Sequence, residues 1–111
     1  MSKAIYVVQS SALDAEHEAA YDTWYDNEHI PDVLDVPGFV SARRFRIADG
    51  GEDAHTFLTI YEIDADDVQA SVKELFRMAQ AGDMNILDQV WSARSPITTL
   101  GALIGDNQAA R

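Results

Sequence analysis

The sequence predicts an α+β fold with the element order β-α-β-β-α-β, and three observations carry that prediction. Segments rich in Ile, Val, Tyr and Phe, which favour strands, occur at 4–9, 39–47 and 56–63. Longer segments with apolar residues at helical spacing precede the second of them and follow the third. A turn cluster at 48–53, which contains Gly50 and Gly51, joins the two middle strands as in an antiparallel hairpin. This order is that of the ferredoxin-like arrangement, a four-stranded antiparallel sheet with both helices on one face.

The first strand, at 4–9, is a run of apolar residues typical of a strand that is covered on both faces. Ser10 and Ser11 follow it and offer side-chain oxygens that can cap a helix. We expect that helix over 13–29. We also expect the chain to bend near His29 and Ile30, because Pro31 lacks a backbone donor and disfavours helical geometry at the residue before it. The alternative is that the helix restarts there as a short turn with Pro31 at its first position.

In the second strand, over 39–47, alternation places Phe39 and Arg43 on one face and Arg44 and Arg46 on the other. Two cations on one face can hold a carboxylate substrate through paired hydrogen bonds. They can equally form ion pairs with acids of a neighbouring element. Both interpretations stay open at this point.

The second helix follows the third strand, with Asp64 or Asp66 as its expected N-cap and Gly82 as its stop signal. Its apolar residues recur at the spacing of a core-facing stripe. A fourth strand is expected over 89–100. Pro96 interrupts it, which favours an edge position or a bulge.

Length and composition narrow the possible functions. The chain has 111 residues, which fits one domain over 1–111 with a small, polar, frayed tail from about 105 to 111. It carries 8 Lys+Arg against 19 Asp+Glu, a net charge of −11, so we expect neither nucleic acid nor a membrane as partner. There is no cysteine, which excludes disulfides and thiolate chemistry. We expect a cytoplasmic protein, because the N-terminus has no secretory signal pattern.

The strands carry large apolar residues at positions of both parities, for example Ile5, Tyr6, Ile60 and Tyr61. Only one face of the sheet can pack against the two helices. The other face would then expose a large apolar surface. The sequence therefore predicts a homodimer in which a second copy covers this open face of the sheet.

Three segments resemble the dimeric α+β barrel superfamily, and its EthD-like branch in particular, which includes muconolactone-type isomerases. They are WYDNEHIPD at 24–32, VPGF at 36–39 and ARRF at 42–45. The shared pattern is a His at the end of the first helix, a Pro-Gly about eight residues later, and the second strand. The resemblance implies a dimeric barrel and small-molecule chemistry without a fixed reaction type. Ala42 departs from it, since some relatives have a tyrosine at that position.

His29 is the leading catalytic candidate, because an imidazole can accept or donate a proton near neutral pH. The resemblance implies that it faces a pocket. Asp32 is the expected partner that orients the imidazole and stabilises its protonated form, as the acid of a catalytic triad does. The alternatives are a helix-capping role for His29 and a solvated surface position for Asp32.

Substrate-binding candidates are aromatic or ionisable residues that the predicted elements bring near His29. Aromatic side chains can line a pocket, and tyrosine phenols can hydrogen-bond a developing oxyanion. Each candidate has a structural alternative, namely core packing for the aromatics, ion pairing for the arginine, and a surface position for the other two. The candidates are Trp24, Tyr25, Tyr6, Tyr61, Arg44, His55 and Glu62.

No metal site and no cofactor are expected. The three His residues lack the spacing of a metal site, and there is no Gly-rich phosphate loop. The leading hypothesis is therefore a cofactor-independent isomerase, cyclase or lyase that acts on an aromatic-derived or polyketide-like small molecule. The alternatives are a non-catalytic dimeric ligand-binding or accessory protein, and a small monooxygenase or haem-binding member of the same superfamily.

Overall fold

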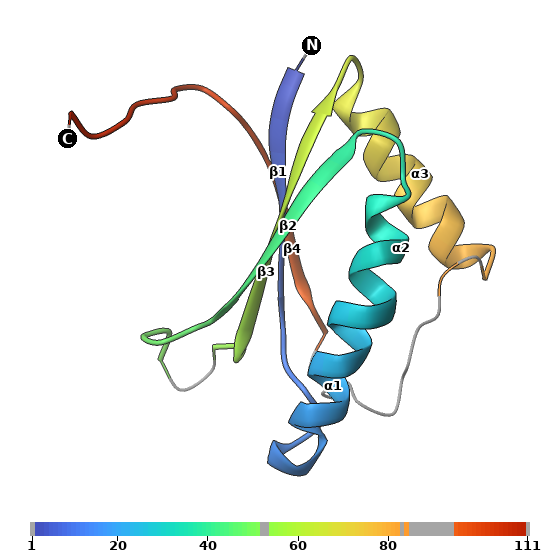
Figure 1. Cartoon of the computed structure of the whole chain (residues 1–111), viewed down its shortest axis with the longest axis vertical. Coiled ribbons are helices and arrows are strands. Elements are labelled where there is room, and N and C mark those ends of the chain that lie inside the picture. Colours follow the sequence, from blue (N-terminus) through green and yellow to red (C-terminus); the bar gives the residue numbers. More distant parts are fainter. Residues whose placement is uncertain (1, 52–53, 83, 85–94, 111) are drawn as a thin grey trace.

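The structure, a computed structural model, describes residues 2–51, 54–82, 84 and 95–110. Its centre is a four-stranded antiparallel sheet with the strand order β2-β3-β1-β4. The helices cover one face of this sheet (Figure 1). The predicted fold class is thus confirmed. The strands are β1 (Ser2–Ser10), β2 (Phe39–Arg46), β3 (Phe57–Ala65) and β4 (Ile97–Ala102).

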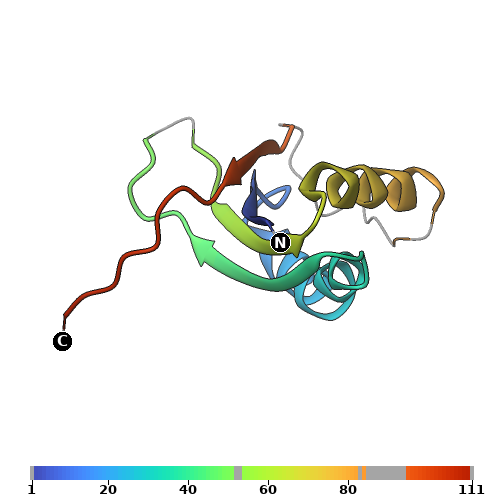
Figure 2. The same cartoon turned by 90° about the horizontal axis from the view of Figure 1, so that it is seen from above.

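A long, almost continuous helix follows β1, and a second helix, α3 (Val68–Gln80), follows β3. Seen from above, both lie on the same side of the sheet (Figure 2). The long helix changes its winding along its length. Its parts are a 3₁₀ turn η1 (Ala15–His17), α1 (Glu18–Trp24), a π-helical turn η2 (Tyr25–His29) and α2 (Ile30–Leu34).

The chain does not leave the helix at His29, because helical structure continues through Pro31 to Leu34. Pro31 lies in the first turn of α2, in agreement with the alternative of a restart. The π turn explains how this is possible. The Ile30 N–H bonds to the Tyr25 carbonyl, five residues back, instead of four. This wider turn directly before Pro31 lets the helix pass a residue that has no backbone donor.

The helix caps also differ from the expectation. Asp14 caps the first turn, since its side chain accepts from the His17 N–H. Asp67 caps α3 in the same way, through Ala70. Ser10 and Ser11 instead bond to distant residues, which a local capping rule does not foresee.

A β-bulge between Phe39 and Ser41 changes the faces of β2. Phe39 pairs with Ile63, and Arg44 pairs with Thr59, two residues that are buried on the helix side of β3. Phe39 therefore shares a face with Arg44 and not with Arg43, contrary to strict alternation. The fourth strand begins after Pro96, so the proline does not interrupt it. The predicted strand residues 89–94 lie outside the described residues.

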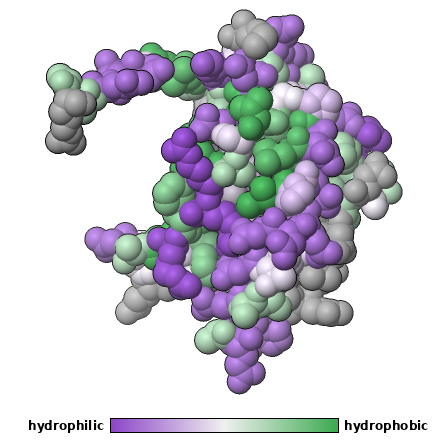
Figure 3. All heavy atoms as spheres, viewed as in Figure 1, coloured by the Kyte–Doolittle hydropathy of each residue, from purple (hydrophilic) through white to green (hydrophobic). Residues whose placement is uncertain are grey.

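The sheet face away from the helices is called the open face below. It carries the alternate residues of the strands, among them Lys3, Ile5, Arg43, Phe45, Ile60, Glu62 and Ile97. Beyond β4, residues 103–110 form an extended arm that leaves on the side of the open face (Figures 1 and 2). The space-filling view shows this arm standing clear of the rest of the molecule (Figure 3).

At Gly38, the turn before β2 packs closely on α3. Its φ is +99°, and a Cβ there would overlap the Ser71 hydroxyl of α3. We expect Gly38→Ala to lower the free energy of unfolding by about 2–4 kcal/mol, measured by urea denaturation. Gly51 is the matched control, with φ of +87° and no atom within 4 Å of the point that a Cβ would occupy. An equal loss in Gly51→Ala would show that backbone strain alone, and not packing, accounts for the effect.

Candidate active site

The π turn determines where the His29 side chain points. The His29 ring stacks on the Trp24 indole, with ring centroids 4.6 Å apart and planes at 18°. In a regular α-helix, residues five apart are rotated by about 140° about the axis and do not meet. The wider η2 turn brings them together. Sequence reasoning missed this turn, although Pro31 was a signal that the hydrogen bonding before it must be irregular.

Burial controls the protonation of His29. Its Nδ1 is buried and has no hydrogen-bond partner among the described residues. Burial lowers the pKa of His29 to about 4, although the negative charge of Asp32 acts in the opposite direction. The imidazole is therefore neutral at pH 7. The alternative of a helix-capping role is not what the geometry shows, because this histidine lies inside a helix that continues beyond it.

This lowered pKa makes stability depend on pH. The folded state binds a proton at His29 less readily than the unfolded chain, so His29 destabilises the fold as the pH falls below about 6.5. Between pH 7.5 and 5 we expect a loss of about 2 kcal/mol from this group. The measurement is urea unfolding of the native protein and of His29→Gln at both pH values. The native protein should lose more stability than the variant, and parallel losses would contradict a lowered pKa of His29.

Aromatic side chains of the long helix surround His29. Tyr25 meets the imidazole edge-on, with centroids 5.2 Å apart, and Trp24 and Tyr25 are 1% and 0% exposed. Tyr21 lies 5.0 Å from Tyr25, and its hydroxyl hydrogen-bonds with Ser10 Oγ. These side chains form one buried cluster with Phe57 of β3.

Tyr61 and Tyr6 belong to the neighbouring core cluster, and Ile30 packs against both clusters. The Tyr61 hydroxyl is buried and has no hydrogen-bond partner among the described residues. Burial raises the pKa of Tyr61, with a further contribution from Tyr25, so the phenol stays protonated. Tyr61 pairs directly with Ala42 across the sheet. The Tyr61 phenol therefore lies beside Ala42, the position at which the resemblance implies a tyrosine in some relatives.

Arg44 lies on the flank of this aromatic cluster and is held by acids. Its guanidinium lies 4.5 Å from the Tyr25 ring centroid. It forms ion pairs with Asp22 at 2.9 Å and Asp26 at 3.5 Å. Of the two interpretations of the strand cations, the structure shows the ion pairs, and Arg46 likewise pairs with Glu18 at 2.9 Å.

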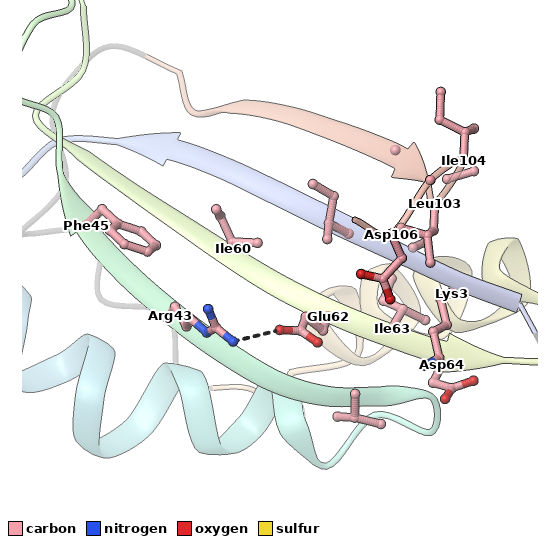
Figure 4. Close-up of a pocket in the computed structure, with 16 residues that line it drawn as sticks. Lys3, Arg43, Phe45, Ile60, Glu62, Ile63, Asp64, Leu103, Ile104 and Asp106 are labelled. Atoms are coloured by element: carbon pink, nitrogen blue, oxygen red, sulfur yellow. Dashed lines mark hydrogen bonds and ion pairs between the residues drawn. The ribbon is translucent and has the colours of Figure 1, made fainter. Parts of the chain in front are cut away.

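Two other candidates have contacts that do not involve His29. His55 is 3% exposed, so the alternative of a surface position is wrong. Its Nδ1 lies 2.9 Å from Ser11 Oγ, and its Nε2 lies 2.9 Å from the Ser95 carbonyl oxygen. Through these two contacts His55 links the start of β3 to Ser11 and to Ser95. Glu62 lies on the open face, on the other side of the sheet, where it pairs with Arg43 at 3.4 Å (Figure 4).

The remaining observations concern cavities, metals and membranes. A cavity of about 710 Å³ lies between the open face and the arm, and His29 does not line it (Figure 4). Within the described ranges, no group of three or more His, Asp or Glu side chains could hold a metal ion. Among those same residues, no helix is long and apolar enough to cross a membrane.

Comparisons with known proteins give a family for the sequence and solved structures with a similar fold. The profile of a family described as a domain of unknown function (DUF4286) matches residues 3–93. No curated protein matches the sequence. The chain is similar in structure to a candidate monooxygenase from Shewanella loihica PV-4, with a TM-score of 0.62, 16% identity, and 96% and 99% of the two chains covered.

Two further solved structures share the fold. An EthD family protein from Bacillus halodurans has a TM-score of 0.51 and 20% identity, over 94% of this chain and 100% of the other. SnoaB, a cofactor-independent oxygenase from Streptomyces nogalater, has a TM-score of 0.52 and 15% identity over 100% of both chains. The resemblance to the dimeric α+β barrel superfamily is confirmed at the level of the fold.

Proposed function

Since this chain belongs to the DUF4286 family, whose function is unknown, we propose an activity from the chemistry of its own residues. It is a cofactor-independent enzyme that removes a proton from a small, aromatic-derived carbon acid. One observation carries this proposal. The Nδ1 of His29 is buried, belongs to an imidazole that is neutral at pH 7, and has no hydrogen-bond partner among the described residues. A protein rarely keeps such a group without a use for it.

In the proposed reaction, an activated C–H group of the substrate lies between the long helix and the sheet. Its proton passes to Nδ1 of His29, and the electron pair of the broken C–H bond moves onto a neighbouring carbonyl oxygen. The negative charge of Asp32, which favours protonated His29, stabilises the imidazolium that forms. Returning the proton to a different carbon completes an isomerisation.

Tyr61 is the proposed donor to the developing oxyanion. Its phenol keeps its proton and has no described partner to give it to. A hydrogen bond from such a buried donor is strong, because little water competes for it. Tyr25 meets His29 edge-on, and it also contributes to the raised pKa of Tyr61. Trp24 supplies the flat surface on which the imidazole is held.

The proposed assembly is a homodimer through the open face. Ile5, Phe45 and Ile97 on that face are 40%, 47% and 50% exposed. Covering them with a second copy removes apolar surface from water and leaves the helix side, with His29, unobstructed. Light scattering should give twice the mass of one chain, and a monomer at micromolar concentration would contradict the assembly.

The test of the activity uses anthrone, a tricyclic ketone with an acidic CH₂ group, as a probe. In D₂O without oxygen, the enzyme should speed exchange of the CH₂ protons for deuterium, followed by NMR. Saturable binding of anthrone without faster exchange would contradict the enzyme and support the ligand-binding alternative. If the protein neither binds any carbon acid of a panel of this kind nor speeds its exchange, both the enzyme and the ligand-binding alternative are contradicted.

A second candidate activity is oxygenation, favoured by the similarity to SnoaB and to the Shewanella protein. It begins with the same deprotonation. The carbanion of anthrone then reacts with O₂, and loss of water gives the quinone, so that the CH₂ group and O₂ become a carbonyl group and H₂O. Oxygen uptake in air that depends on the protein supports this activity. Exchange without uptake supports the isomerase or lyase.

A further inference from the structure

Residues 103–110, the arm, are exposed along their whole length. Leu103 donates its N–H to the Lys3 carbonyl at 2.9 Å, which extends the pairing of β4 with β1 by one residue. Beyond that bond, no hydrogen bond of the described residues involves 104–110. Ile104 is 100% exposed, although it is among the most apolar side chains. An extended segment with an exposed isoleucine is incomplete by itself.

The arm and the open face bound one cavity. Leu103, Ile104 and Asp106 form its wall on the side of the arm, and the open face, with Ile5 and Phe45, forms the rest. Figure 4 shows these arm residues at one end of the strands, with Ile60 and Phe45 further along the same face. The cavity of about 710 Å³ is open to solvent in the single chain and large enough to receive side chains of another chain.

The charges around this cavity fit a second copy of the chain. Lys3 and Arg43 supply two cations, while Glu62, Asp64 and Asp106 supply three acids. Arg43 and Glu62 already form a pair in which both side chains are well exposed. A surface with both signs can pair its cations with the acids of a second copy under twofold symmetry. The net charge of −11 disfavours the other extended partners, nucleic acid and an anionic membrane.

We propose that the arm is exchanged between the two protomers of the homodimer. In this arrangement residues 103–110 of each protomer lie against the open face of the other, and Ile104 packs among its apolar side chains. Each arm is frayed in a single chain and becomes ordered on the partner. Because of the twofold symmetry, each contact occurs twice. The inference rests on the proposed homodimer but is independent of the chemistry at His29.

The first test truncates the chain after Leu103, which keeps the last hydrogen bond to Lys3. The truncation removes Ile104 from both protomers. The dissociation constant of the dimer, measured by analytical ultracentrifugation, should rise by roughly 10–100-fold for each of these two Ile side chains that is no longer buried. Ile104→Asp should have a similar effect. Gln108→Asp adds the same charge to the same arm without removing an apolar side chain, and it should change the dissociation constant by less than Ile104→Asp.

The second test locates the arm directly. Asn107→Cys gives a single attachment point for a nitroxide, because the chain has no other cysteine. This spin-labelled protein is mixed with ¹⁵N-labelled native protein, so that any broadening of ¹⁵N amide signals comes from the partner's arm. Broadening along β2 and β3 supports the exchange. A dimer without such broadening overturns the arm inference alone, while a monomer overturns the homodimer as well.

Discussion

Replacing His29 by alanine is expected to lower the rate of proton transfer to the probe by roughly 10²–10⁴-fold, the usual contribution of a general base. His29 Nδ1 is the proposed acceptor, and alanine leaves no basic atom at that position. The measurement is the rate of deuterium exchange into anthrone in D₂O. Circular dichroism should show that the variant is folded, because His29 makes no described hydrogen bond through Nδ1.

The matched control for this variant is His17→Ala. His17 is the exposed histidine of the first turn and lies 2.6 Å from Asp14. Its loss should leave exchange unchanged and reduce stability slightly, as expected of an exposed pair. Equal exchange rates in His29→Ala and the native protein would rule out His29 as the base.

Inserting an alanine after Asn27 is expected to reduce exchange nearly as much as removing the imidazole. A π turn already contains one residue more than the α-helical turn it replaces, so η2 does not take up a second extra residue at this exposed position. The part of the helix after the insertion must then rotate by about 100° relative to the part before it. Trp24 and His29 can no longer stack, although both residues are still present.

Asn27→Ala is the control for the insertion, since it keeps the residue count and should keep the activity. Because an insertion can also unfold a helix, its effect is read together with circular dichroism and with the His29 NMR signals. A folded insertion variant with native exchange rates would contradict the role of the π turn. A folded variant with slow exchange and a His29 pKa near 6.5 would support it, since about 6.5 is the ordinary value of a solvated histidine.

Much of the fold was predictable because local patterns and the element order restrict it. Strand-forming runs, a Gly-Gly turn and one clear apolar stripe were enough for the sheet and both helices. The β-bulge at Phe39 and Ser41 was not predictable. One extra residue in a strand changes its faces without changing its composition, so alternation assigned Phe39 to the wrong side.

The site was predictable only in part, for a similar reason. His29 and its aromatic neighbours could be named, because they lie close together in the sequence. Their geometry depends on a hydrogen-bonding shift of one residue in η2, which no pattern of apolar residues encodes. Ser11 and His55 are 44 positions apart, and their contact arises only when the sheet forms. A rule for local caps therefore assigned Ser11 to the nearest helix.

The central claim is that His29 is a neutral base at physiological pH and that its Nδ1 is buried. An NMR titration of the native protein tests it most directly, with ¹⁵N-labelled imidazoles assigned through the His29→Gln variant. We expect His29 to titrate with a pKa of about 4 and its Nδ1 to carry no proton at pH 7. A His29 pKa at or above about 6.5, or a proton on Nδ1 at neutral pH, would contradict this claim.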